Sequence, residues 1–79
     1  GMEVAVEVGP QGAWIKAVGD GQTLQEGGLE PGTKTTFRAQ QELLISTDNA
    51  GSTRLFYNGQ DLGVLGKPGE PLSNIKFTP

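Results

Sequence analysis

The chain has 79 residues, enough for one small domain. It contains 13 Gly and 5 Pro but neither Cys nor His, which excludes disulfide scaffolds, thiolate metal sites and histidine general bases. Its formal net charge is −3, and its six basic residues are spread along the whole chain, which disfavours binding to nucleic acids and to anionic lipid surfaces.

The beginning of the chain bears on its domain organisation. Gly1 looks like a cloning scar, and we assign residues 1–2 to it. Residues 3–79 are expected to form a single all-β domain that has been excised from a larger protein. No apolar run approaches the roughly 18 residues that a membrane-spanning helix needs.

The first half of the chain predicts four strands. Apolar residues alternate with others from Glu3 to Val8, and this period of two is typical of a half-buried strand. Gly19-Asp20-Gly21 suits a tight turn, because glycine adopts a positive φ without a Cβ clash. A loop is expected over residues 27–32. The strands expected in this half cover residues 3–8, 13–18, 22–26 and 33–38.

The second half continues the pattern of short strands between turns. Asn58-Gly59 is the strongest hairpin signal in the chain. Residues 39–42 tolerate helix, but the stretch is too short and uncapped to form one. The strands expected in this half cover residues 43–47, 53–57, 62–65 and 73–78.

Glycine, proline and asparagine are assigned to turns and to other structural positions. Pro31-Gly32, for example, suits the two central positions of a type II turn. The residues with this assignment are Gly21, Pro31, Gly32, Asn49, Gly51, Asn58, Gly59, Gly63, Gly66 and Gly69.

The fold class follows from the spacing of the strands. Seven or eight short strands, placed about 8 to 12 residues apart, indicate an all-β sandwich or barrel. We expect mostly antiparallel strands and no substantial helix.

Candidate catalytic and metal sites are few. The serines have no histidine to activate them, and no pair of acidic residues is distinguished from the rest. The glycine-rich stretch over residues 63–69 lacks the spacing of a phosphate-binding loop. Asp20, Asp48 and Asp61 lie beside turn residues, where we expect Asx-type hydrogen bonding rather than calcium binding. We therefore predict no enzyme, no catalytic residues, no metal ion and no cofactor.

The aromatic residues are the best candidates for a binding surface. Trp14 and Ile15 point to opposite faces of one strand, and we interpret Trp14 as a core residue, with a surface position as the alternative. Arg54 and Phe56 lie on the face opposite to Leu55. If the Leu55 face is core, Phe56 is the better candidate for an exposed contact residue. The candidate binding surface therefore comprises Phe56, Arg54 and Trp14.

A series of motifs covers nearly the whole chain, from about Val4 to Phe77. In the first half these are Trp14-Ile15, Asp20-Gly21, Leu24, Gly28-Leu29 and Pro31-Gly32. In the second half they are Leu43-x-Ile45, Asn49-Ala50-Gly51, Leu55-x-Tyr57-Asn58-Gly59 and Leu62-Gly63-x-Leu65-Gly66-Lys67-x-Gly69-Glu70. In order and spacing, this series resembles the C-terminal extracytoplasmic β domain of RodZ-like bacterial cell-shape proteins.

The resemblance implies a location and a class of partner. Such a domain lies on the outer face of the bacterial cytoplasmic membrane and is anchored through its parent protein. The implied partners are cell-envelope proteins, including the wall-elongation machinery. Nucleic acid would not be bound by this domain, and membrane contact would be made only by a segment of the parent.

Two functional hypotheses follow, and both are non-catalytic. The leading one is a protein-interaction module of a RodZ-like cell-shape and wall-elongation protein. The alternative is a glycan- or peptidoglycan-binding β module that uses Trp14 or Phe56 as a stacking platform.

Overall fold

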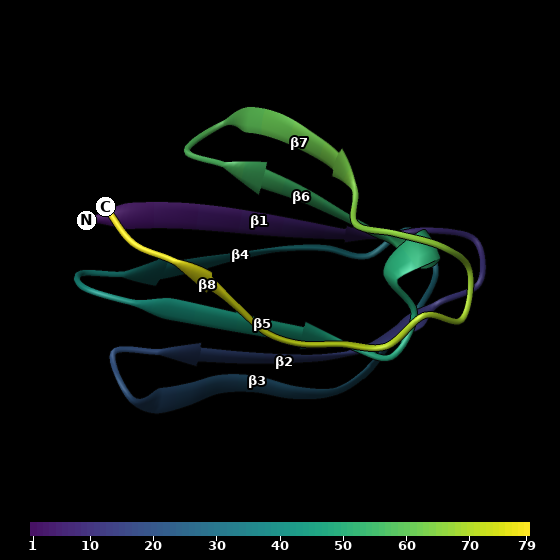
Figure 1. Cartoon of the computed structure of the whole chain (residues 1–79), viewed down its shortest axis with the longest axis horizontal. Coiled ribbons are helices and arrows are strands. Elements are labelled where there is room, and N and C mark those ends of the chain that lie inside the picture. Colours follow the sequence, from purple (N-terminus) through teal and green to yellow (C-terminus); the bar gives the residue numbers. More distant parts are fainter.

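Eight strands build two four-stranded antiparallel sheets in the computed structural model, which describes residues 1–79 (Figure 1). The two sheets form the layers of a sandwich, so the predicted all-β fold is confirmed. The only helical segment is a 3₁₀ turn of three residues, η1 (Ala50–Ser52). The strands are β1 (Met2–Val8), β2 (Ala13–Gly19), β3 (Gln22–Leu29), β4 (Lys34–Ala39), β5 (Leu43–Thr47), β6 (Thr53–Tyr57), β7 (Gln60–Val64) and β8 (Leu72–Phe77).

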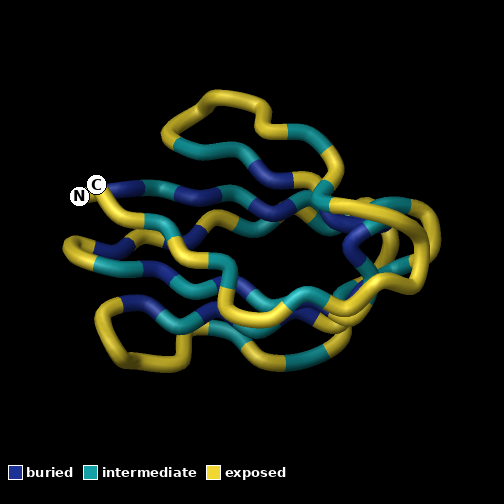
Figure 2. Tube along the Cα trace, in the orientation of Figure 1, coloured by how far each residue is buried: buried dark blue, intermediate teal, exposed yellow.

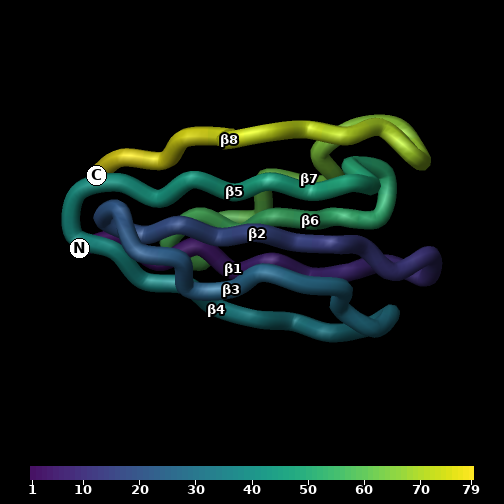
Figure 3. Tube along the Cα trace, turned by 90° about the horizontal axis from the view of Figure 1, so that it is seen from below, coloured from purple at the N-terminus to yellow at the C-terminus, as the bar shows by residue number.

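The chain alternates between the two sheets. The first sheet has the order β4-β1-β6-β7 and the second has the order β3-β2-β5-β8. Only the β2–β3 and β6–β7 connections stay within one sheet, and every other connection crosses to the other layer. Figures 1 and 3 show the strands of both sheets running along the long axis of the molecule. The edge strands are β4 and β7 in the first sheet and β3 and β8 in the second.

The core is built from alternate residues of the central strands. Val4, Val6 and Val8 of β1 are at most 1% exposed, as their alternation in the sequence predicted. The second sheet supplies Ile15 and Ile45, which are fully buried. Figure 2 shows buried and half-buried positions alternating along these strands. Full burial of each such side chain contributes roughly 1.5–3 kcal/mol.

Six of the eight strands have bounds that differ from the sequence-based expectation, and three of these differences are informative. β1 begins at Met2, which is buried, so the ordered sandwich includes a residue that had been assigned to a cloning scar. β3 continues to Leu29, although residues 27–32 were expected to form a loop. β7 covers Gln60–Val64 rather than residues 62–65. The extension of β3 arises because its last residues pair with β2, and this pairing outweighs the weak strand preference of glycine.

Both hairpin turns have the backbone geometry that their sequences favour. Asp20 and Gly21 connect β2 to β3 with φ of 50° and 79°. Asn58 and Gly59 connect β6 to β7 with φ of 47° and 86°. Two central residues with positive φ identify type I′ turns, so both predicted turns are confirmed.

One end of the sandwich is fastened by a single carboxylate. Asp20 accepts hydrogen bonds from the backbone N–H groups of Gln40, Gln41 and Glu42, at 2.8, 2.8 and 3.0 Å. These residues form the corner where the chain crosses from β4 to β5. The Asx-type bond expected at Asp20 is therefore wrong, because its partners are distant in the sequence. The N–H groups, that of Gln40 first, lower the pKa of the Asp20 carboxyl.

The opposite end is fastened by close backbone packing around η1. Ala50 N–H donates to the Glu70 carbonyl at 2.8 Å, and Gly51 N–H donates to the Lys67 carbonyl at 2.9 Å. A Cβ at Gly51 would collide with the backbone nitrogen of Pro68. Only glycine allows this approach, which ties the β5–β6 crossing to the β7–β8 connection.

A buried stack of polar groups joins the two sheets next to η1. Asn49 N–H donates to Thr47 Oγ1 at 3.1 Å, and Thr53 Oγ1 donates to the Asn49 carbonyl at 2.7 Å. The two threonine hydroxyls are 2.8 Å apart. Since Thr53 already donates to the carbonyl, Thr47 is the donor between the hydroxyls, and each group in the network has a partner.

An aromatic pair also joins the two sheets. The rings of Tyr57 in β6 and Phe77 in β8 stack with their centroids 5.9 Å apart, which connects the two sheets near the chain termini.

No helix in the structure combines the length and apolar character required to cross a membrane.

Candidate functional site

The three candidate binding residues do not lie together. Trp14 projects from β2 on the outer face of the second sheet, where its inward neighbour Ile15 is fully buried. Arg54 and Phe56 project from β6 on the outer face of the first sheet, opposite to the buried Leu55. The sequence therefore separated inward from outward residues correctly in β6, but it could not show that two different faces of the sandwich are involved.

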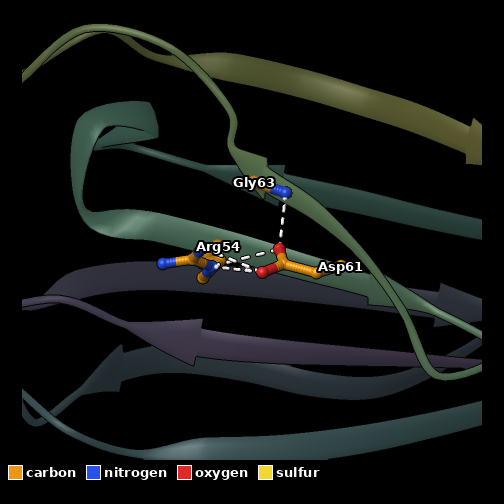
Figure 4. Close-up of polar contacts among 3 residues, drawn as sticks. All are labelled: Arg54, Asp61 and Gly63. Carbon is orange, nitrogen blue, oxygen red and sulfur yellow. Dashed lines mark hydrogen bonds and ion pairs between the residues drawn. The ribbon is translucent and has the colours of Figure 1, made fainter.

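On the first sheet, Arg54 is bound by a residue of the same hairpin. Its Nε and Nη2 donate to the carboxylate of Asp61, at 3.1 and 2.8 Å (Figure 4). The same carboxylate accepts the Gly63 N–H at 2.8 Å, which confirms the Asx-type bond expected at Asp61. Arg54 and then the Gly63 N–H lower the pKa of Asp61, and the Asp61 hydrogen bond raises the pKa of Arg54.

Phe56 also has a partner within the chain. The Nζ of Lys34 lies 4.2 Å from the centroid of the Phe56 ring, a cation–π distance. Lys34 belongs to β4 and Phe56 to β6, and β1 lies between them. Lys34 stands opposite Glu7 on β1, whereas Phe56 stands opposite Ala5, so the lysine side chain reaches diagonally across β1. The ring that the sequence favoured as an open contact residue is half-buried beneath a lysine.

Trp14 is the more exposed aromatic residue. The residue is 36% exposed, so the interpretation of Trp14 as a core residue is wrong. The physical reason is the alternation along β2, in which Ile15 takes the inward position. Across the pair of strands, Trp14 stands opposite Gly28 of β3. A Cβ at Gly28 would meet no atom within 4 Å, so there is open space beside the indole.

This open space is part of a cleft of about 520 Å³, which we call the Trp14 cleft. The end of β3 and the loop after it form one side, and residues that follow β5 form the other. Its carboxylates belong to Glu30 and Asp48, and no basic residue lines it. The lining residues are Gln11, Gly12, Ala13, Trp14, Gly28, Leu29, Glu30, Pro31, Asp48 and Asn49.

Asp48 holds Trp14 in place. The Trp14 N–H donates to Asp48 Oδ1 at 2.8 Å, and the Asp48 N–H donates to the Trp14 carbonyl at 3.2 Å. The Asx-type bond expected at Asp48 is therefore replaced by bonds to a different strand. These two bonds continue the pairing of β2 with β5 beyond its last regular pair, Ile15 with Thr47. The backbone beneath the indole is fixed by its neighbours on both sides.

The residues assigned to structural positions lie at turns and close approaches. Gly32 has φ of 84°, and Thr33 N–H donates to the Glu30 carbonyl at 3.1 Å, as in a type II turn with Pro31 before the glycine. Asn49 accepts the Gly69 N–H at 2.8 Å. A Cβ at Gly66 would collide with the Glu70 carboxylate. Gly21 and Gly59 occupy the hairpin turns described above, together with Asn58, and Gly63 lies within β7 at φ of 83°.

Two further observations concern the remaining polar groups. Ser52 Oγ is buried without a hydrogen-bond partner, and the chain has no histidine to act on it as a base. No group of three or more acidic side chains is placed to hold a metal ion. The Trp14 cleft is therefore the candidate functional site. Sequence reasoning missed Gly28 and Glu30 as parts of it, because only the pairing of β2 with β3 brings them beside Trp14.

The chain matches the model of a known protein family. The family model described as RodZ C-terminal domain matches residues 10–76, which is most of the chain. No curated protein and no solved structure matches it. The family match confirms the resemblance drawn from the sequence motifs.

Proposed function

Because the chain belongs to the RodZ C-terminal domain family, we propose that it is a non-catalytic interaction module of a bacterial cell-shape protein. Its partners are proteins of the cell envelope, including the wall-elongation machinery. The contact is made through a surface of the sandwich rather than through a reacting group.

The observation that carries this proposal is the open Trp14 cleft. Tryptophan is enriched at protein interfaces because it offers a large contact area at a small cost in conformational entropy. Here it is 36% exposed and lies in a cleft whose backbone is fixed by Asp48. A rigid, partly exposed aromatic residue is typical of a surface that binds a partner.

The proposal includes a location on the outer face of the cytoplasmic membrane. The absence of cysteine from the chain provides a test. In the parent protein, Ser73→Cys places a thiol on the exposed edge strand β8. A membrane-impermeant maleimide should label this variant in intact cells, whereas the unsubstituted parent is the control. Labelling that requires lysis of the cells would contradict the location.

The function is tested in a bacterium that carries the parent protein. Deletion of residues 2–79 from the parent should disturb cell shape and the positions of wall-elongation enzymes. Trp14→Ala in the otherwise intact parent should reproduce part of this defect, while Phe56→Ala should not. Normal shape and normal enzyme positions after deletion of the domain would refute the interaction role.

Wall glycan is a second candidate ligand, favoured by one observation. The amide side chains of Gln11 and Asn49 line the cleft beside Trp14, and amides with an aromatic ring can bind sugar hydroxyls and a sugar face. Soluble wall fragments can be titrated while the fluorescence of Trp14, the only tryptophan, is recorded. A saturable change in emission would support this candidate, and a flat titration would exclude it.

A further inference from the structure

The Trp14 cleft carries unbalanced negative charge. The structure gives no ion pair to Glu30 or Asp48, and only one oxygen of Asp48 accepts a hydrogen bond. No lysine or arginine lines the cleft. The nearest outward residue along β2, Lys16, stands opposite Glu26 rather than in the cleft. Charge complementarity therefore favours a cationic group as the occupant.

The first sheet shows how this protein places a cation over an aromatic ring. Lys34, which stands opposite Glu7 of β1, reaches diagonally from β4 across β1 to the ring of Phe56 on β6, with Nζ 4.2 Å from the ring centroid. The backbones of β4 and β6, which carry the lysine and the ring, are two strand spacings apart, or about 10 Å. On the strand between them, the residue directly beside Phe56 is Ala5, which has a small side chain.

The second sheet also places a small residue directly beside its outward aromatic residue, but without a cation. Trp14 lies on β2, and Gly28 on β3 stands opposite to it with open space above. β3 is an edge strand, so one side of its backbone is free to pair with another strand. A strand added at this edge would be two strand spacings from Trp14, as β4 is from β6.

We propose that the Trp14 cleft binds an arginine or lysine side chain of an extended partner segment that pairs along β3. The side chain crosses Gly28, places its cation on the indole face and is flanked by Glu30 and Asp48. Pairing of the segment with an edge strand supplies affinity, and the cation supplies selectivity. This inference rests on the proposed interaction function and names the chemistry of the partner.

The same charges argue against wall glycan in this cleft. The N-acetylated sugars of the glycan strand carry no cationic group that could balance Glu30 and Asp48. Glycan binding is therefore an outcome of the test that would replace this proposal.

The test uses the whole chain and short strand-forming peptides with blocked ends and a central arginine, lysine or glutamine. Fluorescence of Trp14 reports binding. The arginine and lysine peptides should bind at least about fivefold more tightly than the glutamine peptide, and high salt should reduce this difference. Equal affinity for all peptides, or no binding by the basic ones, would overturn the proposal. Binding of wall fragments that the basic peptides cannot displace would overturn it in favour of glycan.

Three variants locate the interaction. Glu30→Gln should weaken binding of the arginine peptide several-fold, because one flanking charge is lost. Glu7→Gln removes the same charge from the outer face of the first sheet and should leave the affinity unchanged. Gly28→Val should abolish the preference for arginine over glutamine, since its side chain would occupy the path to Trp14. An equal effect of Glu30→Gln and Glu7→Gln would contradict a contact in the cleft.

The two proposals can fail separately. A defect in cell shape after deletion of the domain, together with failure of the basic peptides, would retain the interaction function and remove the cation cleft. Binding of the basic peptides with no effect of deletion on shape would do the reverse.

Discussion

The outer faces of the two sheets each present one aromatic residue from a central strand, yet only one of these residues is available to a partner. On the first sheet, Lys34 lies over the ring of Phe56, and Asp61 forms an ion pair with Arg54. On the second sheet, Trp14 lies beside Gly28, and no side chain crosses the glycine to cover it. We therefore propose that an outward aromatic residue can serve as a binding site only where its own chain leaves it without a partner. The comparison teaches that the neighbours across the sheet decide this, rather than the aromatic residue itself.

The largest expected effect comes from removing the support of the Trp14 cleft. Gly51→Ala places a Cβ against the backbone of Pro68 and should displace η1 together with Asn49, which lines the cleft. We expect a loss of about 3 kcal/mol in the free energy of unfolding, measured with urea. Gly28→Ala is the matched control, because its Cβ meets nothing, and it should change stability by less than about 0.5 kcal/mol. Equal effects of the two substitutions would show that η1 is not tightly packed.

A smaller effect is expected in the hairpin of the other face. Gly59→Val forces a β-branched residue to φ of 86° and should cost about 1–3 kcal/mol. Gly59→Asn, which tolerates this φ, should cost only a few tenths of a kcal/mol. The emission maximum of Trp14 should be the same in both folded variants, since the hairpin belongs to the opposite sheet. A shifted maximum in folded Gly59→Val would mean that the two faces are coupled.

The contact of the Lys34 cation with the Phe56 ring should contribute less to the free energy of unfolding than the hairpin glycine does. Lys34→Ala removes the cation and exposes the ring, and we expect a loss of about 0.5–1 kcal/mol. Lys16→Ala, on the face that bears Trp14, should be nearly neutral because Lys16 makes no ion pair in the structure. A loss from Lys16→Ala as large as that from Lys34→Ala would remove the distinction between a covered and an open face.

The smallest expected effect is on the loss of stability at acidic pH. The folded-state pKa of Asp61 lies below its ordinary value, so its contribution to stability is present at neutral pH and is lost as pH falls below about 5. Asp61→Asn should therefore reduce the loss of Tm on acidification, and high salt should shrink this difference because Arg54 is exposed. The pKa of Asp20 is lowered in the same direction by backbone N–H groups, so Asp20→Asn should act similarly but with little dependence on salt. An Asp61→Asn variant with the acid sensitivity of the parent chain would contradict the role given to the Arg54 pair.

The strands and hairpins could be predicted because their signals are local. Alternation from Glu3 to Val8 marks β1, and Asn58-Gly59 marks the β6–β7 turn. The turn residues and the family resemblance also come from short motifs. Each of these signals lies within a few residues of the feature that it predicts.

The partners of the outward residues could not be predicted, because they depend on register. Asp20 bonds to a corner some twenty residues away, which no local pattern reveals. Lys34 covers Phe56 only because β4 and β6 both flank β1. Trp14 was assigned to the core because alternation places Trp14 and Ile15 on opposite faces of β2 but does not say which of the two faces inward.

The most direct test of the account is a map of where a basic segment contacts the folded domain. The arginine peptide is titrated into ¹⁵N-labelled protein, and the amide and indole N–H shifts are followed by NMR. The account predicts changes at the Trp14 indole, at Gly28 and at the other residues of β3, with none at Arg54 or Phe56. Changes centred on Phe56, with the Trp14 indole unmoved, would contradict it.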